Sequence, residues 1–431
     1  MYDFDFAVAG GGPAGSSAAI SLAQRGHKVV LFEREKFPRF HIGESLLPTA
    51  NDHFAELGLA DEIEAACFPP KWGAQLYTHD GQGGRGVDFT SSREVRNART
   101  FQVCREELDR ILLERARRLG VDVREQRRIS ACEFDSQAAT VAFIGPDGET
   151  GRVRVKAMVD ATGGNGLLAR KFDLRTPEPR LANVALYSHF SGVPLIEGDR
   201  PTDLRLISRN DAGWFWLIPI SENLMSVGVV VPREIYMSWP HGDPAEILDR
   251  AIADTPVVAA MMREAKREWP VRVEKDFSYS ASTYAGDRWL LAGDAGSFLD
   301  PVFSTGVSIA LESGIEAAAA LDAAARRDRF TARQFAAYSR RQGRRFRFFR
   351  RFVVGFYTPE FRDLFFSADP PQGIFRAVVT VLAGNWQPRL PTRLVIELFF
   401  ASVAMQRWFS FSPRLARREP SAGFFGRRRA A

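Results

Sequence analysis

The sequence of 431 residues predicts an α/β fold, in which a Rossmann-like unit carries an inserted antiparallel sheet and is followed by a helical C-terminal region. Three observations lead to this prediction. The chain begins with a glycine-rich strand–turn–helix–strand unit. Its middle holds two neighbouring apolar runs that are rich in aromatic and β-branched residues. Residues 331–431 have a helical pattern with many arginines and phenylalanines.

The N-terminal unit has the glycine spacing of a dinucleotide-binding turn. An apolar run at 4–9 is followed by GGGPAG, then by the helix-like SSAAISLAQRG and the apolar HKVVLFE. Glycine permits the tight turn and lets backbone N–H groups approach a pyrophosphate at the positive end of the helix. We expect the cofactor to contact Gly10, Gly12, Pro13, Ala14 and Gly15.

An acidic residue ends the second strand of this unit. Glu33 lies about 20 residues beyond the glycine turn, where a carboxylate can accept hydrogen bonds from ribose hydroxyls. Its charge disfavours a 2′-phosphate, so a dinucleotide without that group is expected. The neighbouring Arg34 is expected to contact the same cofactor.

Two later strands also end in residues suited to a ligand. VRVKAMVDATG ends at Asp160–Gly163, and RWLLAGDAG ends at Gly293 and Asp294. Ligands of open α/β sheets bind at the carboxyl ends of strands, where a carboxylate can bond ribityl or ribose hydroxyls. A helix expected from about Gly306 to Ala325 can present its first amides to a flavin pyrimidine or to an anion. The three motifs in this order predict an FAD-binding oxidoreductase.

The domain organisation follows from where these motifs lie. GWFWLIPI and LMSVGVVV flank Ser221–Asn223, which predicts a hairpin in an antiparallel sheet. We expect the FAD-binding domain to be split around that sheet, with a helical region at the end. The predicted segments are 1–182 and 282–330 for the FAD-binding domain, 183–281 for the substrate-side sheet and 331–431 for the helical region.

Composition limits the remaining possibilities. The net charge is +6, and arginines cluster at 340–351 and 414–429. In the first cluster, Phe348 and Phe352 at helical spacing favour a helix with an apolar stripe and a solvated arginine face over nucleic-acid binding. Docking of an acidic carrier protein is the functional alternative for this helix.

The chain has three cysteines without a CxxC pair, so neither a disulfide framework nor a metal site is expected. No basic segment precedes the first apolar run, and no stretch is apolar enough to span a membrane. A cytoplasmic location is expected.

These motifs resemble those of the group A flavin monooxygenases and their relatives. The resemblance rests on G-x-G-x-x-G, on Arg105 in VCREELD, on DATG and on AGDAGSFLDP. Within that group the chain more closely resembles the flavin-dependent halogenases, because GWFWLIP and FLDPVFSTG match two of their signatures. The resemblance covers roughly residues 4–330. It implies FAD contacts for Arg105 and, in GESLLP, for Glu44 and Ser45.

The resemblance implies a halogenation reaction. Reduced FAD (FADH2) and oxygen oxidise chloride or bromide, and a lysine matched by Lys71 in FPPKWGA directs the hypohalous acid to an aromatic substrate. Burial beside Phe68 and Trp72 can lower the pKa of such a lysine. The halide is expected on the turn formed by Ser304, Thr305 and Gly306, whose backbone amides can hold a small anion.

The substrate implied is an electron-rich phenol or pyrrole, free or tethered to an acyl or peptidyl carrier protein, in natural-product biosynthesis. Phe303 stands where the tryptophan halogenases have a glutamate, so free tryptophan is not expected. No second dinucleotide motif is present, and a separate NAD(P)H-dependent flavin reductase is expected to supply FADH2. The identity of a catalytic base stays open among three residues, His53, His189 and Glu44.

Two other functions stay open at this point. A flavin-dependent aromatic hydroxylase or a prenyl-chain reductase would use the same FAD motifs without Lys71 or the halide turn. A redox-inactive flavin-binding assembly protein is the more distant alternative.

Overall fold

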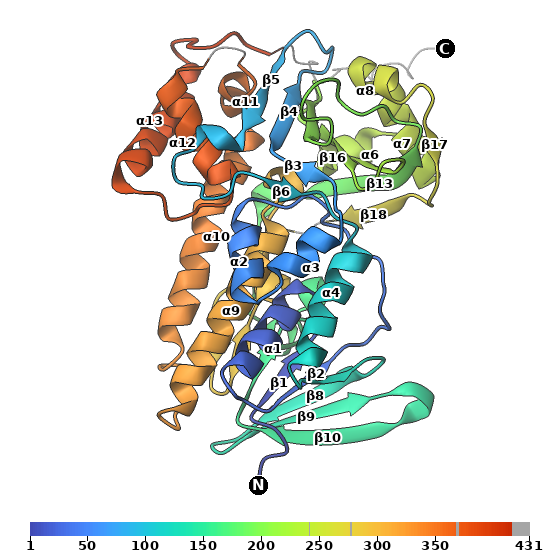
Figure 1. The fold of residues 1–431 in the computed structure, drawn as a ribbon. Coiled ribbons are helices and arrows are strands. Elements are labelled where there is room, and N and C mark those ends of the chain that lie inside the picture. Colours follow the sequence, from blue (N-terminus) through green and yellow to red (C-terminus); the bar gives the residue numbers. More distant parts are fainter. Residues whose placement is uncertain (241, 276–277, 368–369, 416–431) are drawn as a thin grey trace, which may run out of the picture.

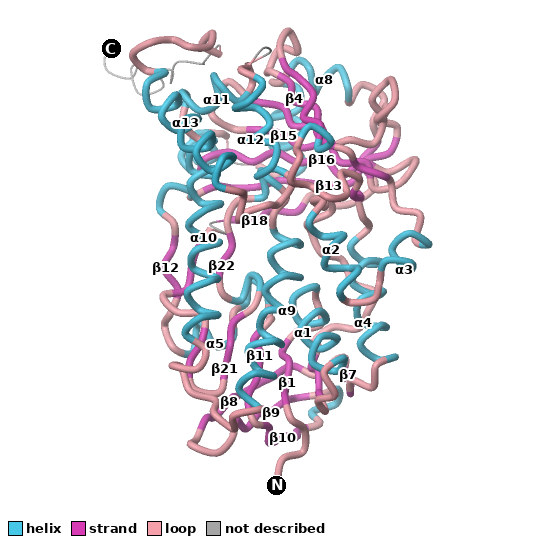
Figure 2. The backbone as a smooth tube through the Cα atoms, turned by 60° about the vertical axis from the view of Figure 1, so that its left-hand side comes forward, coloured by secondary structure: helices cyan, strands magenta, loops and turns pink. Residues whose placement is uncertain are grey.

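The structure, a computed structural model, describes residues 1–240, 242–275, 278–367 and 370–415. Figure 1 shows two layers along the long axis of the molecule, with the N-terminal α/β unit below and a large, mostly antiparallel sheet beside the C-terminal helices above. The long helices α9 (Gly306–Ala325) and α10 (Ala336–Phe356) run beside the lower unit toward the upper layer (Figures 1 and 2). The predicted α/β class and helical C-terminal region are confirmed.

The lower layer is a six-stranded sheet in the order β20-β21-β11-β1-β2-β7. Its strands are parallel except for β20, and the four-residue strands β1, β2 and β11 are fully buried. Continuous apolar runs are expected where both faces of a sheet are covered. The strands are β1 (Phe6–Ala9), β2 (Val29–Phe32), β7 (Asp122–Arg124), β11 (Ala157–Asp160), β20 (Ala285–Gly286) and β21 (Trp289–Leu291).

Three helices pack closely on this sheet. They are α1 (Pro13–Gln24), α4 (Arg105–Arg118) and α9, which form one apolar core with the strands. Gly314 allows the close approach of α9 to α1, because a side chain at this position would overlap Ser17 and the carbonyl oxygen of Ala14. The close approach brings the first turns of α1 and α9 to the carboxyl ends of the strands.

The upper layer is an eight-stranded sheet in the order β17-β13-β16-β15-β14-β4-β5, with β18 paired to β13. The predicted hairpin is present as the antiparallel pair β15 and β16. Strands β4 and β5 come from within the predicted 1–182 segment, so this sheet takes strands from two predicted segments, whose boundaries stay a prediction. The strands are β4 (Gly73–Tyr77), β5 (Gly84–Asp88), β13 (Asn183–Ser191), β14 (Leu204–Ser208), β15 (Trp214–Pro219), β16 (Met225–Pro232), β17 (Lys266–Arg267) and β18 (Arg272–Lys275).

Smaller sheets and helices complete the two layers. One short antiparallel pair matters for the site, because it consists of β3 (Pro70–Lys71) and β6 (Thr100–Phe101). The other strands are β8 (Arg128–Phe134), β9 (Ala139–Ile144), β10 (Thr150–Val155), β12 (Arg175–Pro177), β19 (Tyr279–Ala281) and β22 (Ser297–Phe298). The shorter helices are α2 (Thr49–Glu56), α3 (Ala60–Ala65), α5 (Leu167–Lys171), α6 (Arg233–Ser238), α7 (Pro244–Ala253) and α8 (Pro256–Met261).

The C-terminal region consists of α10, α11 (Pro359–Phe365), α12 (Gln372–Leu382) and α13 (Leu390–Gln406). Its phenylalanines share a core with the upper sheet, and Phe352 in α10 is buried as the helical spacing predicts. Four of the seven arginines of α10 pair within the chain: Arg341 and Arg345 bond Glu316, Arg350 bonds Glu178 and Arg351 bonds Glu397. These pairs argue against α10 as a free basic docking surface. Most of the second arginine cluster, from 416 onward, lies outside the described residues.

Within the described residues no helix is long and apolar enough to cross a membrane. The three cysteines are free thiols.

Candidate active site

The glycine turn between β1 and α1 has the shape that a pyrophosphate needs. Gly10 has φ +103°, and a side chain there would overlap the carbonyl of Ala161 on the neighbouring strand loop. A side chain on Gly15 would overlap Gly10 in the same way. Helix α1 starts with Pro13, and no side chain caps its first turn. Its N-terminus is therefore free to bind an anion.

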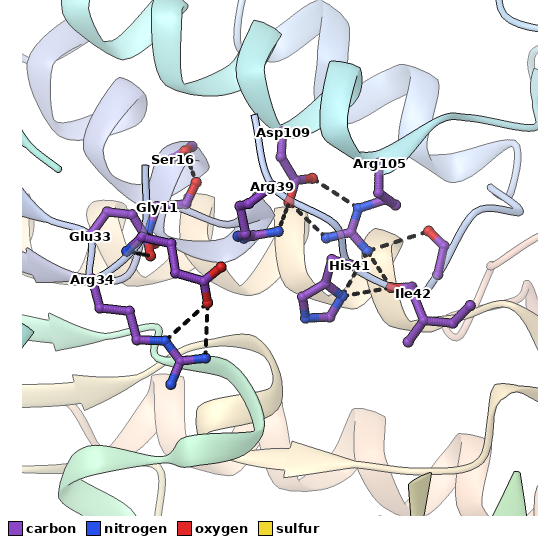
Figure 3. Close-up of polar contacts among 11 residues, drawn as sticks. Gly11, Ser16, Glu33, Arg34, Arg39, His41, Ile42, Arg105 and Asp109 are labelled. Atoms are coloured by element: carbon purple, nitrogen blue, oxygen red, sulfur yellow. Dashed lines mark hydrogen bonds and ion pairs between the residues drawn. The ribbon is translucent and has the colours of Figure 1, made fainter. Parts of the chain in front are cut away.

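Glu33 lies beyond the end of β2 as the sequence predicts. Its side chain is buried, with Oε2 accepting a hydrogen bond from the Gly11 N–H at 2.7 Å and Oε1 accepting one from the Glu35 N–H at 2.9 Å. A carboxylate has about four acceptor sites, so two of them remain for ribose hydroxyls. Arg34 is exposed and pairs with Glu35 (Figure 3).

A buried ion cluster stands beside the glycine turn. Arg105 donates from Nε and Nη2 to the two carboxylate oxygens of Asp109, each at 2.9 Å, and Arg39 donates to the same carboxylate (Figure 3). Nη1 of Arg105 also donates to the carbonyl oxygen of Ile42 at 2.6 Å. The guanidinium of Arg105 is thus used within the chain, so we assign it the role of positioning the 42–46 segment.

Charge pairing stabilises the ionised forms in this cluster. Burial by itself raises the pKa of Asp109, but the Arg105 and Arg39 guanidinium groups outweigh burial and hold that pKa below its usual value. Arg39 also lies close to the glycine turn, because a Cβ on Gly12 would be 3.4 Å from its Nη2. Arg39 is therefore a candidate for a pyrophosphate contact.

The two later strand ends differ in what their carboxylates do. Asp160 is fully buried and accepts hydrogen bonds from Thr162 and from the Leu168 N–H, so its oxygens hold the DATG loop. Asp294 is half-buried, and its carboxylate has no hydrogen-bond partner among the described residues. Burial raises the pKa of Asp294 to about 7 against the pull of Arg105 and Arg175. Of these two carboxylates, only that of Asp294 is free to bind a ligand.

The turn before α9 has the features of a small anion site. Ser304 adopts a left-handed conformation with φ +54°, and Thr305 caps α9 without a side-chain hydrogen bond. A Cβ on Gly306 would meet only Phe298, at 3.8 Å, so space remains over the first turn. Because α9 has 20 residues and an open first turn, its N–H groups can hold a halide.

The residues before this turn are held by the C-terminal region. Phe303 is buried and contacts the edges of Phe356 and Phe365, so no carboxylate faces the turn at this position. Asp300 is buried and accepts hydrogen bonds from Asn183 and from the Tyr357 hydroxyl, and that hydroxyl accepts one from the Trp214 indole. The tryptophan of the GWFWLIP signature thus holds the fold together at this point.

Lys71 is unusual among the residues of the site because its amine is buried. Its side chain is 1% exposed, and Nζ donates to Ser45 Oγ and to the Leu46 carbonyl oxygen, both at 2.8 Å. Phe89 covers it with its ring 5.4 Å from Nζ. Burial lowers the pKa of Lys71 from 10.5 to about 7, although Asp203 acts in the opposite direction. A substantial fraction of this group is a neutral amine near pH 7.

Glu44 lies in the same segment and points to the upper sheet. Its Oε1 lies 2.6 Å from Nε2 of His189 on β13, and both side chains are buried. Oε2 of Glu44 and Nδ1 of His189 have no partner among the described residues. The segment from Ile42 to Leu46 therefore contacts α4, the upper sheet and Lys71.

The comparisons with known proteins agree with this geometry. Residues 3–346 match the family of the FAD binding domain. The chain is 33% identical over 359 residues to a 1H-pyrrole-2-carbonyl-[peptidyl-carrier protein] chlorinase of Pseudomonas fluorescens, covering 78% of this chain and 80% of that one. It is 34% identical over 324 residues to the corresponding brominase of Pseudoalteromonas luteoviolacea, covering 74% and 77%.

Two solved structures are similar over nearly the whole chain. A flavoprotein/dehydrogenase of Cytophaga hutchinsonii superposes with a TM-score of 0.86 at 27% identity, over 94% of this chain and 99% of that one. The myxobacterial chondrochloren halogenase CndH superposes with a TM-score of 0.77 at 32% identity, over 93% and 97%.

The fold and the open glycine turn define an FAD-binding flavoprotein. Within that class the chain belongs to the flavin-dependent halogenases, which makes it an enzyme that uses FAD and a halide. Inside this family the hydroxylase, reductase and assembly-protein alternatives lose their support.

Three residues that the sequence analysis did not single out belong to the site, and one of them had a signal in the sequence. Asp109 is four residues beyond Arg105 on one helix, a spacing that places both on one face and that was open to recognition. Asp203 is remote in sequence, yet its carboxylate accepts hydrogen bonds from the Trp72 and Gly73 N–H groups and so fixes the backbone after Lys71. Phe89 over Lys71 is likewise a result of folding.

Replacing Asp109 by asparagine tests the buried cluster. The substitution leaves two guanidinium groups without their anion, so we expect a loss of about 3 kcal/mol in the free energy of unfolding and release of FAD. Denaturant unfolding and FAD retention on gel filtration measure both. Glu107→Gln is the matched control, because its pair with Arg110 on the same helix is exposed and is worth about 0.5 kcal/mol. Equal losses in both variants would contradict the assignment.

Lys71→Met tests the buried amine through the pH dependence of stability. The folded-state pKa of about 7 lies below 10.5, so the unfolded chain binds more protons between these values and stability of the natural protein rises with pH across that window. The gain in stability from Lys71→Met should therefore be larger at pH 6 than at pH 9, by on the order of 2 kcal/mol. Denaturant unfolding at both pH values measures it. The exposed Lys36→Met is the control, and the same pH dependence in both variants would refute the burial of charge at Lys71.

Proposed function

We propose that this halogenase chlorinates or brominates an electron-rich ring, a pyrrole or a phenol, presented as an acyl group on a carrier protein, and that Lys71 directs the oxidised halogen. The observation that carries the proposal is the buried amine of Lys71, which is held by Ser45 and Leu46 and has a pKa of about 7. Nothing in hydroxylation or chain reduction calls for a lysine in such a place.

The residues around the glycine turn fit FAD, with Gly10, Gly12 and Gly15 giving the pyrophosphate room and Glu33 facing the ribose. When bound in its reduced form, FAD supplies with oxygen the oxidising equivalent that converts a halide to hypohalous acid. Asp294 and the first amides of α9 face the remaining part of the cofactor site, and we propose that Pro13, Ala14, Arg34, Glu44, Arg105 and Gly293 support it. A separate NAD(P)H-dependent reductase is proposed to provide the reduced flavin.

Lys71 can act on hypohalous acid in either protonation state. The neutral amine exchanges an N–H for an N–halogen bond and releases water, and the ammonium form donates a hydrogen bond that polarises the O–halogen bond. Two acceptors fix the position of Nζ, so the lone pair of the neutral amine, or the third N–H of the ammonium form, has a defined direction. Halogen transfer to a ring carbon then releases the ring proton, which a pyrrole or phenol loses without a strongly basic partner.

The proposed halide seat is the turn of Ser304, Thr305 and Gly306. Its backbone amides lie at the start of a 20-residue helix, and Phe303 keeps the neighbouring surface apolar. An apolar, buried surrounding strengthens the attraction between a small anion and N–H dipoles.

Two relatives support the carrier-bound substrate. The chlorinase and the brominase each act on 1H-pyrrole-2-carbonyl attached to a peptidyl carrier protein. The ring that they halogenate is electron-rich, which agrees with the lack of a carboxylate at Phe303.

Mass spectrometry with a bromide-containing reaction tests the proposal. The FAD-loaded protein, a flavin reductase, NADH, oxygen and bromide should convert pyrrole-2-carbonyl carrier protein to a product with the bromine isotope doublet. Lys71→Ala should lower the rate at least 100-fold, the scale of a positioned proton-transfer group, while NADH consumption continues. Lys36→Ala is the control. A gain of one oxygen that is equal in all three proteins would identify a hydroxylase instead.

Gly306→Pro tests the halide seat, because it removes one amide at the first position of α9. A proline also disfavours the αR conformation of the preceding Thr305, so denaturant unfolding is measured beside activity. The Michaelis constant for bromide should rise about tenfold, the cost of one hydrogen bond to an ion, while FAD content is kept. Gly306→Ala retains the amide and should behave as the natural protein. An unchanged bromide constant in the proline variant would place the halide elsewhere.

A further inference from the structure

A cavity is lined by residues of β5 and of the C-terminal helices α11, α12 and α13. Figure 1 shows these elements together in the upper layer. Its volume is about 180 Å³. The lining includes the rings of Phe365, Phe375 and Phe399 and the hydroxyl-bearing Ser402. Neither Lys71 nor the halide turn borders it, so this cavity is separate from the site of the proposed reaction.

Arg85 on β5 contributes the only guanidinium among the described residues that line this cavity. Nη2 donates to the carbonyl oxygen of Phe365 at 2.9 Å, and the guanidinium lies over the ring of Phe375 at 4.2 Å. Nε and Nη1 are buried and have no hydrogen-bond partner in the part of the chain that the structure describes. Arg85 thus has a positive charge and free donors inside a mostly apolar cavity.

Such an arrangement is unfavourable without a ligand. A partly buried charge without an anion and buried N–H groups without acceptors each destabilise the folded state. Burial lowers the pKa of Arg85 to about 10, which still leaves the group positive at neutral pH. The described lining has no aspartate or glutamate that could compensate it. A ligand that brings its own negative charge would remove this cost.

The rest of the lining defines the other part of that ligand. Aromatic and aliphatic side chains dominate, with Ile374 and Val378 of α12 beside the phenylalanine rings. Apolar surface of this kind favours an apolar body, while the guanidinium pairs with a carboxylate through charge-assisted hydrogen bonds. We propose that this cavity is a binding site for a carboxylate with an apolar acyl or aryl body, anchored by Arg85.

Helix α12 connects the cavity to the surroundings of Lys71. Thr380 on α12 shares a hydrogen bond of 2.7 Å with Ser92, in the turn that follows Phe89. Phe89 is the residue whose ring covers Lys71. Helix α12 therefore lines the cavity through Val378 and bonds the turn beside Lys71 through Thr380, and the binding proposed here does not depend on the reaction proposed above.

Isothermal titration calorimetry of the FAD-loaded protein with octanoate tests the proposal. The aryl carboxylate 3-phenylpropanoate is titrated as a second ligand, and 1-octanol serves as the uncharged control. Saturable binding of at least one carboxylate is expected. The dissociation constant of 1-octanol should be at least tenfold higher than that of the carboxylate. Arg85→Gln should weaken carboxylate binding about tenfold or more, and Ser402→Phe, which fills the cavity without changing the charge, should also weaken it. Arg376→Gln removes an exposed arginine from the same helix and should bind as the natural protein does.

FAD retention confirms that each variant is folded. Absence of saturable binding to the natural protein, or equal binding by the Arg85→Gln variant, would overturn the proposal. Neither result bears on bromination, which is measured separately.

Discussion

The hydrogen bonds from Lys71 to Ser45 and Leu46 hold the site together, because they fix a buried amine onto the segment that Arg105 also binds. Arg105 binds the other end of this segment through the carbonyl oxygen of Ile42. Two buried cations therefore hold five consecutive residues, one from α4 and the other from β3. The segment in turn bonds the upper sheet through Glu44 and His189.

Burial has opposite consequences for the two cations. Arg105 has the Asp109 carboxylate at 2.9 Å and keeps its charge, which suits a residue that positions a loop. Lys71 has only neutral acceptors in direct contact, so burial lowers its pKa toward 7 and leaves it chemically available. The same segment thus has a permanent charge at its Ile42 end and a titratable amine at Ser45 and Leu46. This difference is the physical basis for assigning positioning to Arg105 and chemistry to Lys71.

Much of this organisation could be predicted from the sequence. The glycine turn, Glu33 beyond β2 and the helix from Gly306 depend on local spacing, and the structure has them where the pattern indicates. Asp160 was expected to be a possible ligand contact, but it holds its own loop, because a strand-end carboxylate can accept from the chain as readily as from a ribose. The contacts of Lys71 with Ser45, and of Asp203 with Trp72, join residues that are distant in sequence, so no local pattern indicates them. The C-terminal arginine run also shows the limit of composition, since its partners Glu178, Glu316 and Glu397 come from three other segments.

The central claim is that Lys71 is a buried amine that loses its proton near neutral pH. Carbon-13 NMR of the FAD-loaded protein with labelled lysine ε-carbons measures this directly, since the chain has few lysines and Lys71→Arg assigns the resonance. The account predicts one lysine that titrates close to pH 7 and is missing from the variant. A Lys71 resonance that titrates near 10.5, as an exposed lysine does, would contradict it.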